Sequence, residues 1–162
     1  VRVRFFTRAG VRGRSGRLRF DAAMGILFRP GGSVSCADVP TVVAIGLAGA
    51  LGALARYGVD GVVARAAPGA FPWGTFTVNV TGSFALGLVF TVLTEHLAVE
   101  PWVRSLVTIG FLGSYTTFST LSLESYRLLE DGAIGLALLN TVGSLAAGLA
   151  AVYLGIVAGR AL

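Results

Sequence analysis

Four long runs of apolar residues alternate with short polar breaks along most of this chain. The runs cover about residues 42–63, 73–94, 101–129 and 133–158. About 20 helical residues of this kind are enough to cross the hydrocarbon core of a bilayer. Trp73 and Trp102 stand at the starts of the second and third runs, where indole rings prefer the headgroup level. The pattern predicts an all-α membrane protein whose four transmembrane helices form one domain over residues 39–162.

The third run contains a polar stretch that does not fit an ordinary apolar helix. Residues 113–120 read GSYTTFST, and six of these eight residues carry a hydroxyl group. Gly110 and Gly113 weaken the helix, and the hydroxyl side chains compete for its backbone hydrogen bonds. We therefore expect the third helix to be broken mid-membrane, where protein, water or an ion must satisfy the freed backbone groups.

Polar side chains also share one face of the second run and one face of the fourth. Thr75, Asn79 and Ser83 are spaced by four residues, and so are Asn140 and Ser144. This spacing stacks side chains on one face of a helix. An asparagine in lipid either links two helices or lines a polar lane, and three stacked donors favour the lane.

Few charged side chains lie within the runs. Arg56 lies roughly four turns into the first run, where it either anchors the helix or attracts anions. Glu124 and Arg127, three residues apart near the end of the third run, are placed to form an ion pair. Small residues spaced by four predict close helix packing in the first run. These pairs are Gly46/Ala50, Ala48/Gly52 and Gly49/Ala53.

Composition supports a membrane setting and excludes several classes of function. The mean hydropathy is +0.78, and 13% of residues are charged, whereas about a quarter are charged in soluble domains. The single cysteine, Cys36, excludes a disulfide within the chain, and the single histidine, His96, leaves no Cys/His metal cluster. The sequence offers no Ser-His-Asp set and no paired carboxylates, so we do not expect an enzyme.

Residues 1–38 differ from the rest of the chain. All 13 cationic residues of the protein are arginines, and eight of them lie in this segment. Its apolar run, residues 22–28, is too short to span a bilayer. The segment is either a disordered basic tail on anionic lipid or, as we favour, a mis-assigned start, with translation beginning at Met24 or Val39. We expect no nucleic-acid partner for the four-helix domain.

The arginines that flank the runs beyond residue 38 are evenly divided. Arg104 and Arg160 fall on one side of the predicted bundle, and Arg65 and Arg127 fall on the other. Equal positive charge on both sides gives the chain no preferred orientation. Such a chain can insert both ways up, and two opposite copies can pair.

Three motifs, in their order and spacing, resemble the CrcB/Fluc family of fluoride channels. They are GALGALARY at residues 49–57, FPWGTFTVNVTGSFALG at 71–87 and GFLGSYTTFSTLSLE at 110–124. The resemblance extends over about residues 40–160. It implies a fluoride-selective channel in the cell membrane of a bacterium, through which fluoride leaves the cytoplasm down its electrochemical gradient. It also implies an antiparallel, dual-topology dimer with two fluoride pathways.

The resemblance further implies roles for particular residues. One structural sodium ion would lie where the broken third helices cross, held by the backbone carbonyls of Gly113 and Thr116. Arg56 would stand in the vestibule. The ion pathway would be lined by Asn79, Phe118, Ser119, Thr120 and Ser144. Amide, hydroxyl and phenyl-edge donors of this kind can replace the water that fluoride holds tightly, yet bind it weakly enough to release it.

Two positions depart from the family pattern. Leu121 stands where a second phenylalanine is usual, and Ser114 stands where a second glycine is usual. Leucine keeps the bulk of the side chain but has no ring edge to offer an anion. The native unit is therefore either a homodimer that uses Phe118 alone or a heterodimer with a related subunit. The presence of the other pathway residues in one chain favours the homodimer.

The alternative function is a small four-helix, dual-topology exporter that exchanges protons for organic cations. Such an exporter needs a carboxylate within the membrane part of its first helix. Here Asp60 lies near the end of the first run, and Arg56 lies deeper. A purely structural membrane scaffold would not need polar stripes in three helices. The channel is therefore the favoured interpretation.

A chain that begins at Val39 is expected to insert, dimerise and conduct as well as the full chain, because the predicted domain lies wholly after residue 38. The measurement is fluoride efflux from liposomes that carry equal amounts of each protein. Loss of efflux at unchanged expression would show that residues 1–38 belong to the working protein.

Overall fold

The computed structural model describes residues 39–162, so the interpretations of residues 1–38 lie outside the described part. Within it, four helical segments are long and apolar enough to cross a membrane. They cover Val39–Ala66, Trp73–His96, Pro101–Glu130 and Ile134–Arg160. The prediction of a multi-pass, all-α membrane protein with four spanning helices is confirmed.

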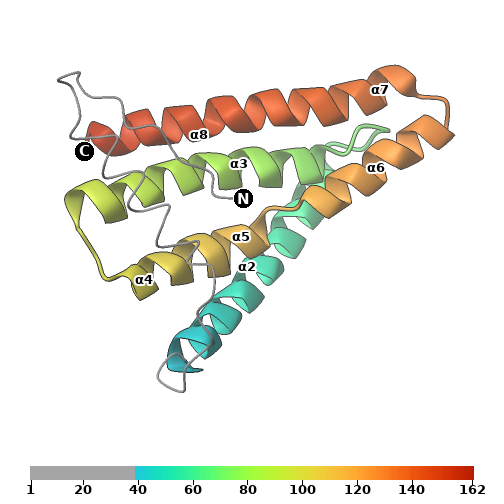
Figure 1. Ribbon diagram of the computed structural model, residues 1–162. Helices are drawn as coiled ribbons and strands as arrows, with labels where there is room; N and C mark the ends of the chain where they lie inside the picture. The colour runs from blue at the N-terminus through green and yellow to red at the C-terminus, as the bar shows by residue number, and fades with distance from the viewer. Residues whose placement is uncertain (1–38) are drawn as a thin grey trace, which may run out of the picture. The chain divides into compact units, whose positions relative to one another are not determined.

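The four segments divide into regular α-helices and short π-helical turns (Figure 1). The first and second segments consist of α2 (Val39–Ala66), α3 (Trp73–Thr91) and η2 (Val92–His96). The third consists of α4 (Pro101–Ser105), η3 (Leu106–Leu112), α5 (Gly113–Tyr115) and α6 (Phe118–Glu130). The fourth consists of α7 (Ile134–Leu138), η4 (Leu139–Gly143) and α8 (Ser144–Arg160).

Local chemistry fixes the short connections between these segments. The rings of Phe71, Trp73 and Phe76 cluster where α3 begins, with centroids 4.6 to 5.9 Å apart. Gly132, in the turn between α6 and α7, has a φ of 72°, a conformation that glycine adopts without steric cost. The N–H of the next residue, Ala133, donates to the carbonyl of Leu128 at 2.8 Å.

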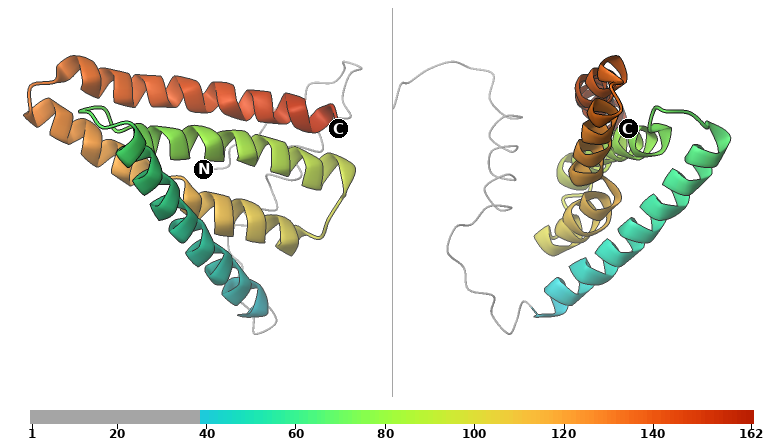
Figure 2. Two further views of the ribbon diagram at one scale, coloured as in Figure 1. Left: turned by 180° about the vertical axis from the view of Figure 1, so that it is seen from behind. Right: turned by 90° about the vertical axis from the view of Figure 1, so that its right-hand side faces the viewer.

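The pair formed by α3 and α8 is the most extensive helix contact in the fold. The two helices lie side by side and run in the same direction (Figures 1 and 2). A Cβ atom at Gly155 would collide with the carbonyl oxygen of Phe84, so the two backbones meet without an intervening side chain. Close approach at small residues is the usual basis of helix association in membranes.

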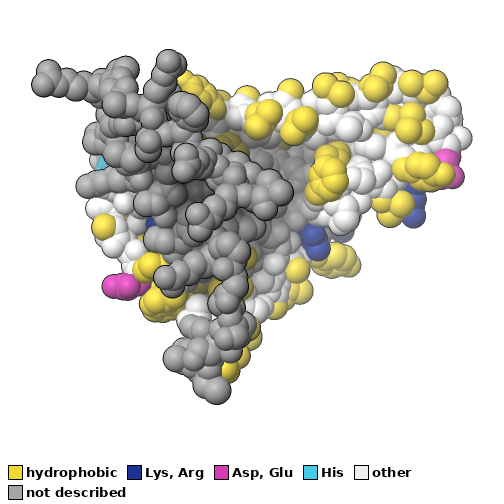
Figure 3. All heavy atoms as spheres, in the orientation of Figure 1, with side chains coloured by type: hydrophobic (Ala, Val, Ile, Leu, Met, Phe, Trp, Pro, Cys, Tyr) yellow, Lys and Arg dark blue, Asp and Glu magenta, His cyan; other side chains and the backbone are white. Residues whose placement is uncertain are grey.

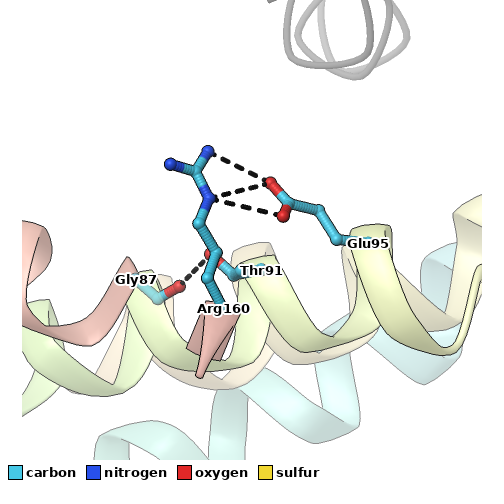
Figure 4. Close-up of polar contacts among 4 residues, drawn as sticks. All are labelled: Gly87, Thr91, Glu95 and Arg160. Atoms are coloured by element: carbon cyan, nitrogen blue, oxygen red, sulfur yellow. Dashed lines mark hydrogen bonds and ion pairs between the residues drawn. The ribbon is translucent and has the colours of Figure 1, made fainter. Parts of the chain in front are cut away.

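An ion pair lies at the C-terminal end of this helix pair. Arg160 of α8 contacts Glu95 of η2 at 3.2 Å (Figure 4). Beside it, the hydroxyl of Thr91 donates to the carbonyl of Gly87 at 2.8 Å. Both ion-pair partners are exposed, so this contact orients the helix ends more than it stabilises the fold.

Helix α2 crosses the other helices at an angle, and its first half projects away from α8 (Figure 2). Ala48 and Gly52 are buried, and a Cβ atom at Gly52 would collide with the carbonyl of Phe111. The predicted small-residue packing is confirmed for this pair. Gly46 has no neighbour among the described residues within 4 Å of the position a Cβ would take, so the described helices do not pack against it.

Among the described residues, some polar side chains are buried and many large apolar side chains are exposed, unlike in a soluble protein. Val78 and Asn140 are fully buried, whereas Leu47, Leu54 and Leu145 are about two-thirds exposed. In the part of Figure 3 that is not covered by grey atoms, apolar side chains are spread over the surface with few charged ones among them. A surface of this kind is stable where lipid or another protein covers it.

Helical structure stops within the third segment. Helix α5 ends at Tyr115 and α6 begins at Phe118. Between them Thr116 has a ψ of 157° and Thr117 has φ and ψ of −148° and 119°, so both are extended. The interruption falls inside the hydroxyl-rich stretch at residues 113–120.

Candidate functional site

The side chain of Asn79 holds the interruption in place. The N–H of Thr117 donates to Asn79 Oδ1 at 2.8 Å, and Asn79 Nδ2 donates to the carbonyl of Thr117 at 3.0 Å. The carboxamide therefore pairs with both backbone groups of Thr117, as a neighbouring strand would. Backbone N–H and C=O groups that lose their helical hydrogen bonds in an apolar interior require such partners. Asn79 thus links α3 to the interruption, and it also lines a cavity described below.

Thr117 begins α6 with a side-chain cap. Its Oγ1 accepts from the N–H of Thr120 at 3.2 Å and donates to the hydroxyl of the same residue at 3.0 Å. The hydroxyl of Ser119 lies 3.3 Å from Thr117 Oγ1. Our sequence reading missed Thr117, although a threonine just before a helix that resumes is a common N-cap signal.

These bonds leave two carbonyl groups without their ordinary helical donors. In an unbroken helix the carbonyl of Gly113 would accept from the N–H of Thr117, and that of Thr116 would accept from the N–H of Thr120. The first N–H is bonded to Asn79 and the second to Thr117 Oγ1. These are the two carbonyls that the resemblance to the fluoride channels implies as ligands of a sodium ion.

A cavity of about 160 Å³ lies where α2, α3 and α6 meet. We call it the Arg56 cavity. Its lining includes Arg56, Asp60, Thr75, Thr117 and Thr120. Two of the predicted pathway residues, Arg56 and Thr120, therefore line this cavity.

Glu124 lies next to this cavity and is bonded to its wall. The hydroxyl of Thr75 donates to Glu124 Oε1 at 2.8 Å. The other oxygen, Oε2, is buried and has no hydrogen-bond partner among the described residues. Arg127 is exposed, and among residues 39–162 it forms no ion pair with Glu124. The predicted pairing of these two residues is therefore wrong, because Glu124 faces α3 instead.

A larger cavity of about 370 Å³ lies between α3, the interruption, α6 and the fourth helical segment. We call it the Ser144 cavity. Its polar lining comes from Asn79, Ser83, Thr116, Thr117, Thr141 and Ser144. Phe118 and Leu121 complete the wall on the α6 side. Thr117 lines both cavities, so it forms the partition between them.

Phe118 and Leu121, three residues apart on α6, differ in exposure although both border the Ser144 cavity. The Phe118 side chain is 81% exposed, whereas Leu121 is 9% exposed. Phe118 therefore remains available to a further surface, while Leu121 belongs to the protomer interior. Sequence alone could not show this difference, because both are large apolar residues at the start of one helix.

A hydrogen-bonded cluster joins α6 to the fourth segment. Asn140, which is fully buried, donates to the hydroxyl of Ser125 at 3.0 Å, and Thr141 donates to the same hydroxyl at 3.0 Å. Ser144 lies 3.5 Å from the carboxamide oxygen of Asn140. The stripe on this helix therefore serves partly as a link between helices. We missed Ser125, which gives no signal in sequence beyond its hydroxyl.

The stripe on α3 connects the two cavities. Thr75 lines the Arg56 cavity, whereas Asn79 and Ser83 line the Ser144 cavity. Ser119 is the one predicted pathway residue that lines neither; it is exposed and close to Thr117 Oγ1. The others are brought into one continuous region of the molecule.

Comparison with known proteins identifies the family of this chain. A family profile described as "CrcB-like protein, Camphor Resistance (CrcB)" matches residues 43–156. A protein of Nitratidesulfovibrio vulgaris (strain DSM 19637 / Miyazaki F), named "Fluoride-specific ion channel FluC", is 49% identical over 119 residues, which are 74% of this chain and 96% of that protein. A protein of the same name from Geobacter sp. (strain M21) is 46% identical over 75% of this chain and 98% of its own length.

A third relative, "Fluoride-specific ion channel FluC 2" of Geobacillus kaustophilus (strain HTA426), is 48% identical over 73% of this chain and 92% of its own length. The three matches cover nearly the whole of each relative. The profile spans most of the part of the chain that the structure describes, including both cavities and the interruption. The chain therefore belongs to the CrcB-like family.

Proposed function

We propose that this protein is a fluoride channel. It is a multi-pass membrane protein that lets fluoride leave the cytoplasm down its electrochemical gradient and so reduces fluoride toxicity. The observation that carries the proposal is the partition at Thr117. There the Asn79 carboxamide fixes the interrupted helix between two cavities lined by hydroxyl groups. The names of the relatives support fluoride as the ion.

The pathway runs from the Arg56 cavity past Thr117 to the Ser144 cavity. Arg56 attracts the anion at one end, because a positive charge in a cleft raises the local concentration of anions. Thr120, Asn79 and Ser144 then offer hydroxyl and amide donors in place of water. Ser119 joins them by rotating away from Thr117, at the cost of one bond that is 3.3 Å long.

Phe118 acts on the ion with the positively polarised edge of its ring. Its exposure in the protomer means that another surface completes the pathway at this point. A second copy in antiparallel orientation supplies that surface and creates two pathways. The even division of the flanking arginines supports this dual topology, and the interrupted third helices of the two copies then cross within the membrane.

The carbonyls of Gly113 and Thr116 fit a structural sodium ion at that crossing. Both have lost their helical donors to Asn79 and Thr117, and oxygen atoms are the ligands that hard cations prefer. A sodium ion held there would offset the negative ends of these carbonyl dipoles. The named relatives come from bacteria, which supports a bacterial cell membrane as the location of this protein.

The exporter of organic cations is not favoured. The carboxylate of α2, Asp60, shares its cavity with Arg56, which would repel a cation. Beyond Asp60, the hydroxyl groups at Thr117 offer hydrogen-bond donors to an anion. Helix α2 carries no second carboxylate.

Liposomes that carry the purified protein and are loaded with equal fluoride and chloride provide the test. Fluoride is expected to leave within the time of the measurement while chloride stays, because we expect the hydroxyl and amide donors of the proposed path to replace the water of a small anion and to exclude a larger one. Ion-selective electrodes record both ions, and protein-free liposomes are the control. Equal chloride efflux, or transport that requires a proton gradient and an organic cation, would contradict the channel.

A further inference from the structure

Asp60 stands in the same cavity as Arg56, one helical turn further along α2. Both are partly buried, and their cavity is small, at about 160 Å³. Neither residue forms an ion pair with another described residue. The cavity therefore contains one positive and one negative side chain that do not neutralise each other by direct contact.

The Asp60 carboxylate packs against α3. A Cβ atom at Gly74, in the first turn of α3, would collide with Asp60 Oδ1. The carboxylate thus lies against the start of α3, which has no side-chain cap and no acidic residue in its own first turn. The N-terminus of a helix attracts negative charge, so this position is favourable for Asp60.

Other charged groups near the cavity do not cancel Asp60. Glu124 adds a second carboxylate behind Thr75, from which it accepts a hydrogen bond. Arg127 is exposed and forms no ion pair with Asp60 within residues 39–162. An anion that approaches Arg56 therefore meets the repulsion of a fixed carboxylate at the same time.

We propose that Asp60 sets the affinity of the Arg56 cavity for anions. It weakens the attraction of Arg56 and of the α3 N-terminus, so that an anion reaches the hydroxyl partition at Thr117 without being retained. Conduction requires binding that is strong enough to admit an ion and weak enough to release it. This inference rests on the proposed channel function and adds a residue that sets its concentration dependence.

The test compares the full chain with Asp60→Asn, which keeps the shape of the side chain and removes its charge. Fluoride efflux from liposomes is recorded over a range of fluoride concentrations at low salt. The half-saturating fluoride concentration is expected to fall about three- to tenfold in Asp60→Asn, the size of effect that one partly screened charge produces at short range. Asp60→Glu should restore a value near that of the unchanged chain.

Asp131→Asn is the matched control, because Asp131 is exposed in the turn after α6 and lines neither cavity. A fall in maximal efflux or in protein yield, with the half-saturating concentration unchanged in Asp60→Asn, would mean that Asp60 only supports α3, and it would overturn the inference. So would an equal shift in Asp131→Asn. An unchanged chain that releases no fluoride would overturn both this inference and the proposed function.

Discussion

Phe118→Ile is expected to reduce fluoride efflux about 100-fold or more while leaving the protomer folded. The side chain is 81% exposed, so its replacement removes little packing within the protomer. Isoleucine is apolar but has no ring edge, and Leu121 supplies none in its place. Efflux measured on liposomes, together with the thermal unfolding midpoint in detergent, separates loss of conduction from loss of fold.

Phe84→Ile is the control, because Phe84 is an exposed ring on α3 that lines neither cavity. Its efflux should match that of the unchanged chain. Leu121→Phe should preserve or raise efflux, because Leu121 borders the 370 Å³ cavity, which has room for a ring. Full activity of Phe118→Ile would assign Phe118 to packing alone and contradict the pathway at this point.

The same variants distinguish the two forms of dimer. A homodimer should conduct when the chain is purified alone and should be silenced by Phe118→Ile. A chain that is inert or unstable alone, but active when co-expressed with a related subunit that carries both rings, would establish a heterodimer.

Asn79→Leu is expected to abolish efflux and to lower the free energy of unfolding by about 2–4 kcal/mol. Leucine has a similar size but cannot bond either backbone group of Thr117, so a buried N–H and a carbonyl would be left without partners. The interruption would then shift, and both cavities share it as a wall. Thermal unfolding in detergent and liposome efflux measure the two effects.

Ser122→Ala is the matched control for this variant. Ser122 is exposed, and among residues 39–162 its hydroxyl bonds only the carbonyl of Phe118 within its own helix, at 2.9 Å. We expect a change within about 0.5 kcal/mol and unaltered efflux. An Asn79→Leu protein as stable as the Ser122→Ala protein would show that the two bonds do not hold the interruption.

Several features of the site depend on contacts that the sequence does not display. The glycines at 110 and 113 predict a weak helix, but the extended residues are Thr116 and Thr117. Gly110 instead packs against α2, where a Cβ would touch the side chain of Ala48. The interruption falls where Asn79, 38 residues earlier in the chain, can bond the backbone of Thr117.

The sequence by itself determined that the helices lie in a membrane, how many of them span it, and which hydroxyl-rich stretch contains the interruption of the third span. These follow from the length of apolar runs and from local competition for backbone hydrogen bonds, which act along the chain. Only the tertiary structure decided which polar residues share a cavity and which link helices. It left Phe118 exposed and buried Leu121, and it placed Glu124 against Thr75 instead of Arg127. Helical periodicity sets which residues share a face, but the close contacts at Gly52 and Gly155 set which faces meet.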